Sequence, residues 1–125
     1  MTGYAINTDA QALLMSPLEN KILIGRTARG RGAGGDPTKG EAAALESEMS
    51  LRTITTDTQL AIIAAGMGGG SGTGAAGHIA RLAKQQGAMT IAVVTYPFNA
   101  EGATRRENAE WGLERLREHC DTLLV

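Results

Sequence analysis

The sequence has a single cysteine, Cys120, and no long hydrophobic run. One cysteine cannot form a disulfide within the chain. No apolar stretch approaches the ~18 residues that a membrane-spanning helix needs, so we expect no insertion into a membrane. The first residues, Met1 to Gly3, contain neither the basic nor the apolar segment of a secretory signal. These absences favour a reduced, cytoplasmic location.

The sequence also lacks an excess of charge of either sign. Its 12 basic and 13 acidic side chains give a net charge of -1 and a pI near 6.1. Because proteins that bind duplex nucleic acid carry a clustered basic surface, we do not expect nucleic acid as a partner. His78 and His119 have no cysteine, histidine or paired carboxylate at ligand spacing, so no protein metal site is predicted.

Glycine, in contrast, is abundant and unevenly placed. Its 17 residues are about twice the usual share of ~7%. One cluster, GMGGGSGTG, covers residues 66–74 and directly follows an apolar run, and the other, GRGAGGDP, covers residues 30–37. Glycine in an ordered segment marks a positive φ or a close approach of the backbone to another group. The excess therefore has a positional cause.

Short apolar runs alternate with stretches of helical periodicity. Asp36 and Pro37 are typical of a helix start, and Gly87 is typical of the residue that follows a helix. The β-branched residues from Thr53 to Thr58 are predicted to lie outside a helix. The predicted strands are 4–6, 21–24, 60–65, 89–95 and 121–125, and the predicted helices are 41–49, 75–86 and 102–120.

This alternation predicts an α/β fold, a Rossmann-like parallel sheet with right-handed crossovers and helices on both faces. The run from Leu60 to Ala65 is typical of a strand that is buried on both faces. The sequence ends inside the apolar run Leu123 to Val125, and few residues precede the first predicted turn. We therefore expect residues 1–125 to be a partial domain, without its first strand and loop and without everything after the last strand.

The loops after three of the predicted strands indicate a binding site. Ligands of doubly wound sheets bind beyond the carboxyl ends of the strands. In the cluster at 66–74, backbone N–H groups and a helix start near Thr73 can point at an anion, and Ser71 and Thr73 add hydroxyl groups. The cluster at 30–37 can contact the distal phosphates at a second helix start. Two such loops predict a polyphosphate ligand.

Other interpretations of the glycines fit less well. A P-loop needs a lysine after its last glycine, and neither cluster has one. A dinucleotide fingerprint is matched loosely by Gly70-x-Gly72-x-x-Ala75, but residues 87–97 contain no acid for the ribose. Gly30-x-Gly32-x-x-Gly35 also matches, although it does not directly follow its strand. An NAD-type domain and simple tight turns remain the alternatives.

Four motifs in order resemble the tubulin/FtsZ family of GTPases, on its FtsZ side. They are NTDAQ at residues 7–11, RGRGAGGDP at 29–37, GMGGGSGTG at 66–74 and VVTYPFNAEG at 93–102. Ser71 stands where the family usually has threonine, and Gly77-His78 replaces its usual Pro-Val. The resemblance covers nearly the whole chain and implies that residues 1–125 are a partial GTP-binding domain.

The resemblance also implies roles for individual residues. A carboxylate suits a sugar diol and a guanidinium suits a phosphate, so Glu101 is expected at the ribose and Arg105 at the phosphates. Ala33, Gly34 and Gly35 are expected near the γ-phosphate. The residues expected to hold the α- and β-phosphates are Gly68, Gly69, Gly70, Ser71, Gly72 and Thr73.

What the resemblance implies about activity concerns a larger protein. Such a protein binds GTP or GDP with Mg²⁺, forms head-to-tail filaments, and hydrolyses GTP where an acidic loop meets the next subunit. It works in the cytoplasm at the division site, with membrane-anchoring division proteins as partners. This sequence has no counterpart of the acidic loop, so we expect no catalytic residue and no hydrolysis by these residues alone. A nucleotide-binding module that does not polymerise is the alternative.

Overall fold

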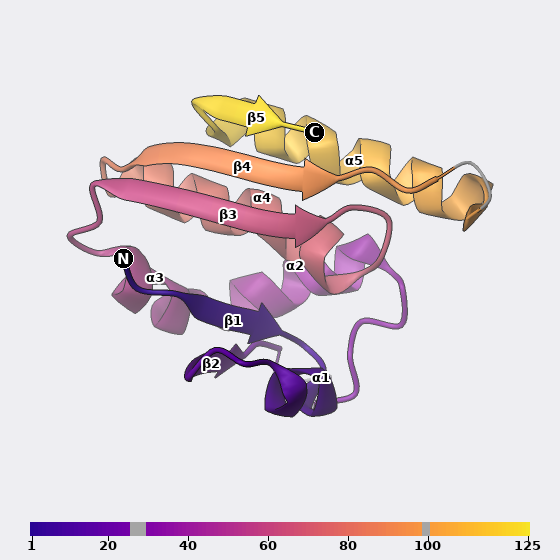
Figure 1. The fold of residues 1–125 in the computed structure, drawn as a ribbon, viewed down its shortest axis with the longest axis horizontal. Helices are drawn as coiled ribbons and strands as arrows, with labels where there is room; N and C mark the ends of the chain where they lie inside the picture. Colours follow the sequence, from indigo (N-terminus) through magenta and orange to yellow (C-terminus); the bar gives the residue numbers. More distant parts are fainter. Residues whose placement is uncertain (26–29, 99–100) are drawn as a thin grey trace.

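A computed structural model describes residues 1–25, 30–98 and 101–125 (Figure 1). Arg29 of the second motif and residues 99–100 of the fourth lie outside the described residues. All five predicted strands are present, and a short helix that was not predicted follows the first of them. The elements are β1 (Tyr4–Asn7), α1 (Ala10–Met15), β2 (Asn20–Leu23), α2 (Pro37–Glu46), α3 (Glu48–Thr55), β3 (Leu60–Gly66), α4 (Ser71–Gln85), β4 (Met89–Thr95), α5 (Ala103–His119) and β5 (Thr122–Leu124).

All strand pairs are parallel, which confirms the α/β prediction. β1 pairs with β2, and β4 lies between β3 and β5. The register of β3 and β4 runs from Leu60 opposite Met89 to Gly66 opposite Thr95. No ladder joins β1 to β3 in the described ranges, although Figure 1 shows them running in the same direction. The carboxyl ends of both strand groups therefore lie on the same side of the molecule.

The helices α2, α3, α4 and α5 lie behind the strands in the view of Figure 1. The other face of the sheet is apolar and exposed: Leu60 and Ile62 of β3 are 46% and 49% exposed, and Met89 and Val93 of β4 are 58% and 43% exposed. Burial of β3 therefore alternates along the strand, and the expectation that it is buried on both faces is wrong for this chain. The alternation arises because successive strand residues point to opposite faces.

α4 is the central helix of the core. One buried cluster includes Ala76 and Ala80 and lies against β4 and α5. The other includes Ala75 and Leu82 and lies against α2 and α3. Small side chains on α4 let its neighbours approach closely: a β-carbon on Gly74 would collide with the backbone oxygen of Pro37. Both clusters thus depend on α4, the helix that follows the glycine loop.

Two helix ends were predicted from local chemistry and are confirmed. Asp36 is the N-cap of α2 and accepts a hydrogen bond from the backbone N–H of Thr38 at 3.0 Å, and Pro37 is the first helical residue. The hydrogen bonds from Thr38 hold the pKa of Asp36 below its usual value. Gly87 follows α4 with φ of +88°, a conformation that side chains rarely adopt.

The prediction that residues 53–58 lie outside a helix is confirmed for residues 56–58 and wrong for residues 53–55, because α3 extends to Thr55. The hydroxyl of Thr53 donates to the carbonyl of Met49 at 3.0 Å, and that of Thr55 donates to the carbonyl of Leu51 at 3.2 Å. These bonds satisfy the threonine side chains inside the helix. Burial of Leu51, which is fully covered, offsets the weak helix propensity of the β-branched residues.

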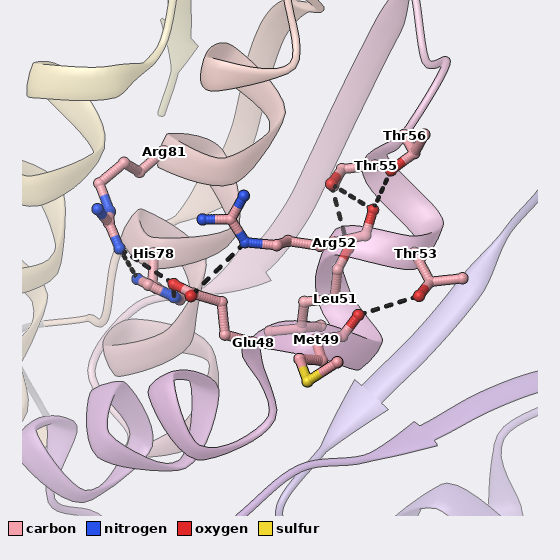
Figure 2. A network of polar contacts seen from close by, with 9 residues as sticks. All are labelled: Glu48, Met49, Leu51, Arg52, Thr53, Thr55, Thr56, His78 and Arg81. Atoms are coloured by element: carbon pink, nitrogen blue, oxygen red, sulfur yellow. Dashed lines mark hydrogen bonds and ion pairs between the residues drawn. The ribbon is translucent and has the colours of Figure 1, made fainter.

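A polar cluster joins α3 to α4 (Figure 2). His78 of α4 is 6% exposed, and Nη2 of Arg81 lies 3.1 Å from its Nδ1. Because a guanidinium can only donate, Nδ1 of His78 is the acceptor and the ring proton is on Nε2. Nε2 lies 3.2 Å from Oε1 of Glu48, but its geometry does not meet that of a hydrogen bond. Burial, and then the charge of Arg81, lower the pKa of His78 below 6.5, whereas Glu48 and Glu41 oppose the shift.

Acidification is expected to weaken the fold through His78. Its pKa is lower in the folded than in the unfolded chain, so stability is highest above pH 6.5 and falls as the pH drops below that value. This group changes the free energy of unfolding by at most about 1.4 kcal/mol per pH unit. Urea unfolding between roughly pH 5.5 and pH 7.5 measures the slope. His78→Gln should reduce it and the control His119→Gln should not, and equal slopes in both variants would refute the assignment.

Candidate functional site

The glycine loop, residues 66–70, connects the end of β3 to the start of α4. The backbone N–H of Met67 donates to the carbonyl of Thr95 at 2.9 Å, and that of Gly68 donates to Oγ1 of Thr73 at 2.8 Å. α4 begins at Ser71, and its N-cap residue is Gly70, which has no side chain to cap the first turn. The N–H groups of a first helical turn have no partner inside the helix and form the positive end of its dipole. The start of α4 therefore has the chemistry that binds phosphate.

The two hydroxyl groups predicted to contact phosphate have different surroundings. Thr73 is fully buried, and its hydroxyl accepts the bond from Gly68. Its backbone N–H can still serve a ligand, but its side chain holds the loop. Ser71 is partly exposed, and its hydroxyl lies 2.5 Å from that of Thr8, a buried residue at the end of β1. Thr8 belongs to the first of the four motifs, and its loop was predicted to line this edge of the sheet, but no ligand contact was predicted for it.

The second glycine loop, residues 30–35, lies directly beside the first. Ala33 is buried, and a β-carbon on Gly70 would be 2.7 Å from its Cβ. Gly34 and Gly35 have φ of +61° and +77°, which favours glycine at both positions. The two predicted loops are thus in contact at the carboxyl side of the strands, as expected for a single ligand.

Glycine at position 69 has no explanation within the chain. Its φ is outside the left-handed region, and a β-carbon placed on it would meet no atom within 4 Å. Gly34 and Gly35 face open space in the same way. By contrast, a β-carbon on Gly70 would be 2.9 Å from the backbone nitrogen of Asp36. The space beside the α-carbon of Gly69 is therefore not filled by any atom of the chain, and a ligand can approach the backbone closely there.

The start of α5 forms another side of the site. A β-carbon on Gly68 would lie 3.2 Å from the carbonyl oxygen of Arg105, so Arg105 is next to the glycine loop. Asn108, one turn further, donates hydrogen bonds to the carbonyls of Gly35 and Gly68, each at 3.0 Å. Asn108 was not predicted, because helical periodicity alone does not indicate which loops a polar side chain reaches.

Glu101, which the resemblance places at the ribose, makes its contacts near the start of α5. Its carboxylate accepts a hydrogen bond from the backbone N–H of Phe98 at 2.6 Å, and it lies 3.8 Å from Nε of Arg105. The side chains of Glu101 and Arg105 are 40% and 50% exposed. Both are therefore accessible at the rim of the site, with Arg105 closer to the glycine loop.

Neither a metal-ligating cluster nor a membrane-spanning helix is found among the described residues. Within residues 1–25, 30–98 and 101–125, no three acidic, histidine or cysteine side chains are placed to hold a metal ion. In the same ranges, no helix has the length and apolar character needed to cross a membrane. The parallel strands and the glycine loop at the start of α4 define the class of the protein: an α/β domain with a helix start of the kind that binds phosphate.

Comparison with known proteins identifies the family. The family model described as "Tubulin/FtsZ family, GTPase domain" matches residues 2–125. The chain therefore belongs to the tubulin/FtsZ family of GTPases, as its four motifs indicated. It is 52% identical over 122 residues to cell division protein FtsZ 1 of Archaeoglobus fulgidus, and 51% identical over 122 residues to that of Methanocaldococcus jannaschii. These matches cover 97% of this chain and 33% and 34% of the relatives, so the chain spans about a third of their length.

Solved structures agree with the sequence match. An empty FtsZ dimer of M. jannaschii superposes with a TM-score of 0.94 and 50% identity, covering 96% of this chain and 35% of that one. CetZ2 from Haloferax volcanii, a GTPγS-bound protofilament, superposes with a TM-score of 0.87 and 30% identity, covering 98% and 39%. The fold of this chain is thus that of the FtsZ GTPase domain over the part that it spans.

Alanine at position 70 should destabilise the fold, whereas alanine at position 69 should not. Gly70→Ala places a methyl group against Ala33 and Asp36 and is expected to lower the free energy of unfolding by about 1–3 kcal/mol. Gly69→Ala meets open space, so stability should be unchanged or rise by up to about 1 kcal/mol. Denaturant unfolding of both variants measures these effects, and a destabilised Gly69→Ala would mean that this glycine serves the fold.

Proposed function

We propose that this chain binds GTP and GDP through its two glycine loops. The residues proposed to contact the α- and β-phosphates are Gly68, Gly69, Gly70, Ser71, Gly72 and Thr73, which surround the uncapped start of α4. Ala33, Gly34 and Gly35 are proposed to lie near the γ-phosphate. The observation that carries the proposal is the open space at Gly69, in a loop that contacts the second glycine loop through Gly70 and Ala33. Membership of a GTPase family supports guanine as the base.

Arg105 and Glu101 complete the proposed site. Arg105 is beside Gly68, where its guanidinium can reach a phosphate, and Glu101 is proposed to bond the ribose after releasing Phe98. Mg²⁺ accompanies the nucleotide. Since no acidic cluster lies in the described ranges, we propose that phosphate oxygens and water hold the ion, an arrangement that Mg²⁺ commonly adopts.

The activity of the whole protein is proposed from its relatives. Solved relatives are titled as an FtsZ dimer and as a GTPγS-bound protofilament of CetZ2. We propose that a protein containing this domain forms head-to-tail filaments, hydrolyses GTP between subunits and acts in the cytoplasm at the division site. Membrane-anchoring division proteins are its proposed partners. These statements concern the parent protein, because this chain spans about a third of such relatives.

Nucleotide should raise the melting temperature of the chain. Ligand at about 100 times its dissociation constant adds about 2.7 kcal/mol to the stability of a folded state that alone binds it. Thermal melts followed by circular dichroism with Mg²⁺ should therefore shift upward with GTP and with GDP but not with NAD, and ATP measures how far the base contributes. Gly69→Ala should reduce the shift without lowering the melting temperature of the free chain. Equal melts with and without GTP would contradict the proposal.

These 125 residues are not expected to hydrolyse GTP by themselves. The sequence has no counterpart of the acidic loop that the family resemblance implies, so bound GTP has no catalytic acid. Phosphate release and light scattering, measured with GTP and Mg²⁺, should both stay at the level of buffer. Rapid turnover or filaments formed by this chain alone would contradict the assignment of catalysis to the subunit interface.

A further inference from the structure

Asn108 connects the two glycine loops. Its Nδ2 donates to the carbonyl oxygen of Gly35 and to that of Gly68, each at 3.0 Å. Both partners are acceptors, and an amide nitrogen carries two hydrogens, so each carbonyl receives one. The side-chain amide has one orientation that satisfies both loops, because the opposite orientation would place its oxygen against two other oxygens. The contact is therefore specific for an asparagine-like donor.

The helix that carries Asn108 is firmly held. Ala109 is fully buried and Leu113 is 2% exposed, both in the core cluster formed with α4 and β4. Nε of Arg115 lies 2.7 Å from Oε2 of Glu41, which joins α5 to α2. The position of Asn108 is thus set by the core and by the helix that follows the second glycine loop. The two carbonyls are fixed relative to a rigid part of the molecule.

The bonds to Asn108 also orient two peptide planes. Gly35 and Gly68 have φ of +77° and +118°, so neither plane is held in a standard helix or strand. In a trans peptide the C=O and the following N–H point in opposite directions. The peptide between Gly35 and Asp36 has this geometry: its carbonyl accepts from Asn108, and its N–H points the other way and donates to the carbonyl of Ala33 at 3.1 Å. By the same geometry, the bond to the Gly68 carbonyl turns the N–H of Gly69 away from Asn108.

We propose that Asn108 is a positioning residue that sets the separation of the two glycine loops and thereby favours a triphosphate over a diphosphate. The proposal rests on the proposed function, in which one loop contacts the α- and β-phosphates and the other lies near the γ-phosphate. A diphosphate needs the first loop alone, whereas a triphosphate needs both loops at the correct distance. Removing the connection should therefore weaken triphosphate binding more than diphosphate binding.

The test compares GTPγS and GDP dissociation constants, measured by calorimetry with Mg²⁺. Asn108→Leu keeps the side-chain size and removes both hydrogen bonds. GTPγS binding should weaken about 10-fold, the effect of one to two neutral hydrogen bonds, and GDP binding less than about 3-fold. Asn108→Asp, which puts one carboxylate oxygen in place of Nδ2 and against both carbonyls, should have a larger effect in the same direction. Asn20→Leu is the matched control, since Asn20 donates to the carbonyl of Gly3 at 3.2 Å, away from both loops.

The outcomes distinguish this proposal from the one on which it rests. If the unaltered chain binds neither nucleotide, the proposed function fails and the role of Asn108 fails with it. If the unaltered chain binds both and Asn108→Leu changes both affinities equally or neither, the positioning role alone is refuted. If thermal melts show that Asn108→Leu does not fold, Asn108→Ser replaces it, because serine retains one hydrogen-bond donor. For the proposal to stand, Asn108→Ser must lower the preference for GTPγS over GDP by less than the roughly 10-fold expected for Asn108→Leu, but measurably.

Discussion

The site depends on a contact between backbones that no side chain could occupy. The first turn of α2 lies against the first turn of α4 so closely that a β-carbon on Gly40 would collide with the carbonyl of Gly70, and one on Gly74 with the carbonyl of Pro37. This steric constraint brings the two helix starts together, and Asn108 connects the two glycine loops that lead into them. The uncapped start of α4 therefore lies beside the second glycine loop. The first N–H groups of α2 are already satisfied, because Thr38 donates to the side chain of Asp36, and Lys39 and Gly40 donate to its carbonyl.

α5 closes the opposite side of the same helix start. A β-carbon on Gly112 would lie 2.7 Å from Cγ2 of Thr73 and 2.9 Å from the sulfur of Met67. Thr73 in turn holds Gly68 through its hydroxyl. The start of α4 is therefore fixed between two helices, and the conformation of its loop is preorganised before a ligand binds. A rigid loop loses little entropy on binding, which favours affinity.

Features set by neighbouring residues could be predicted from the sequence, and those set by distant ones could not. Asp36 with Pro37 indicated a helix start because capping needs only the next two residues. α1 was missed although Asp9 caps it locally, because its six residues are too few to show a helical period. Asn108 was missed because its partners, the carbonyls of Gly35 and Gly68, are distant in the sequence. The four motifs nevertheless indicated the loops that come together, because each motif follows or precedes a strand of the parallel sheet.

The density of glycine, six residues in the nine of GMGGGSGTG, follows from two separate requirements in one short loop. Gly70 and Gly74 are needed by the fold: the missing β-carbon of Gly70 makes room for Ala33 and Asp36, and that of Gly74 lets α2 pack against α4. Gly69 faces open space and is not needed by the fold. Identical letters in the sequence thus have different causes, which only the surrounding atoms distinguish. A loop that served packing alone would tolerate alanine at position 69, so the glycine there is the part of the sequence that points beyond the chain to a ligand.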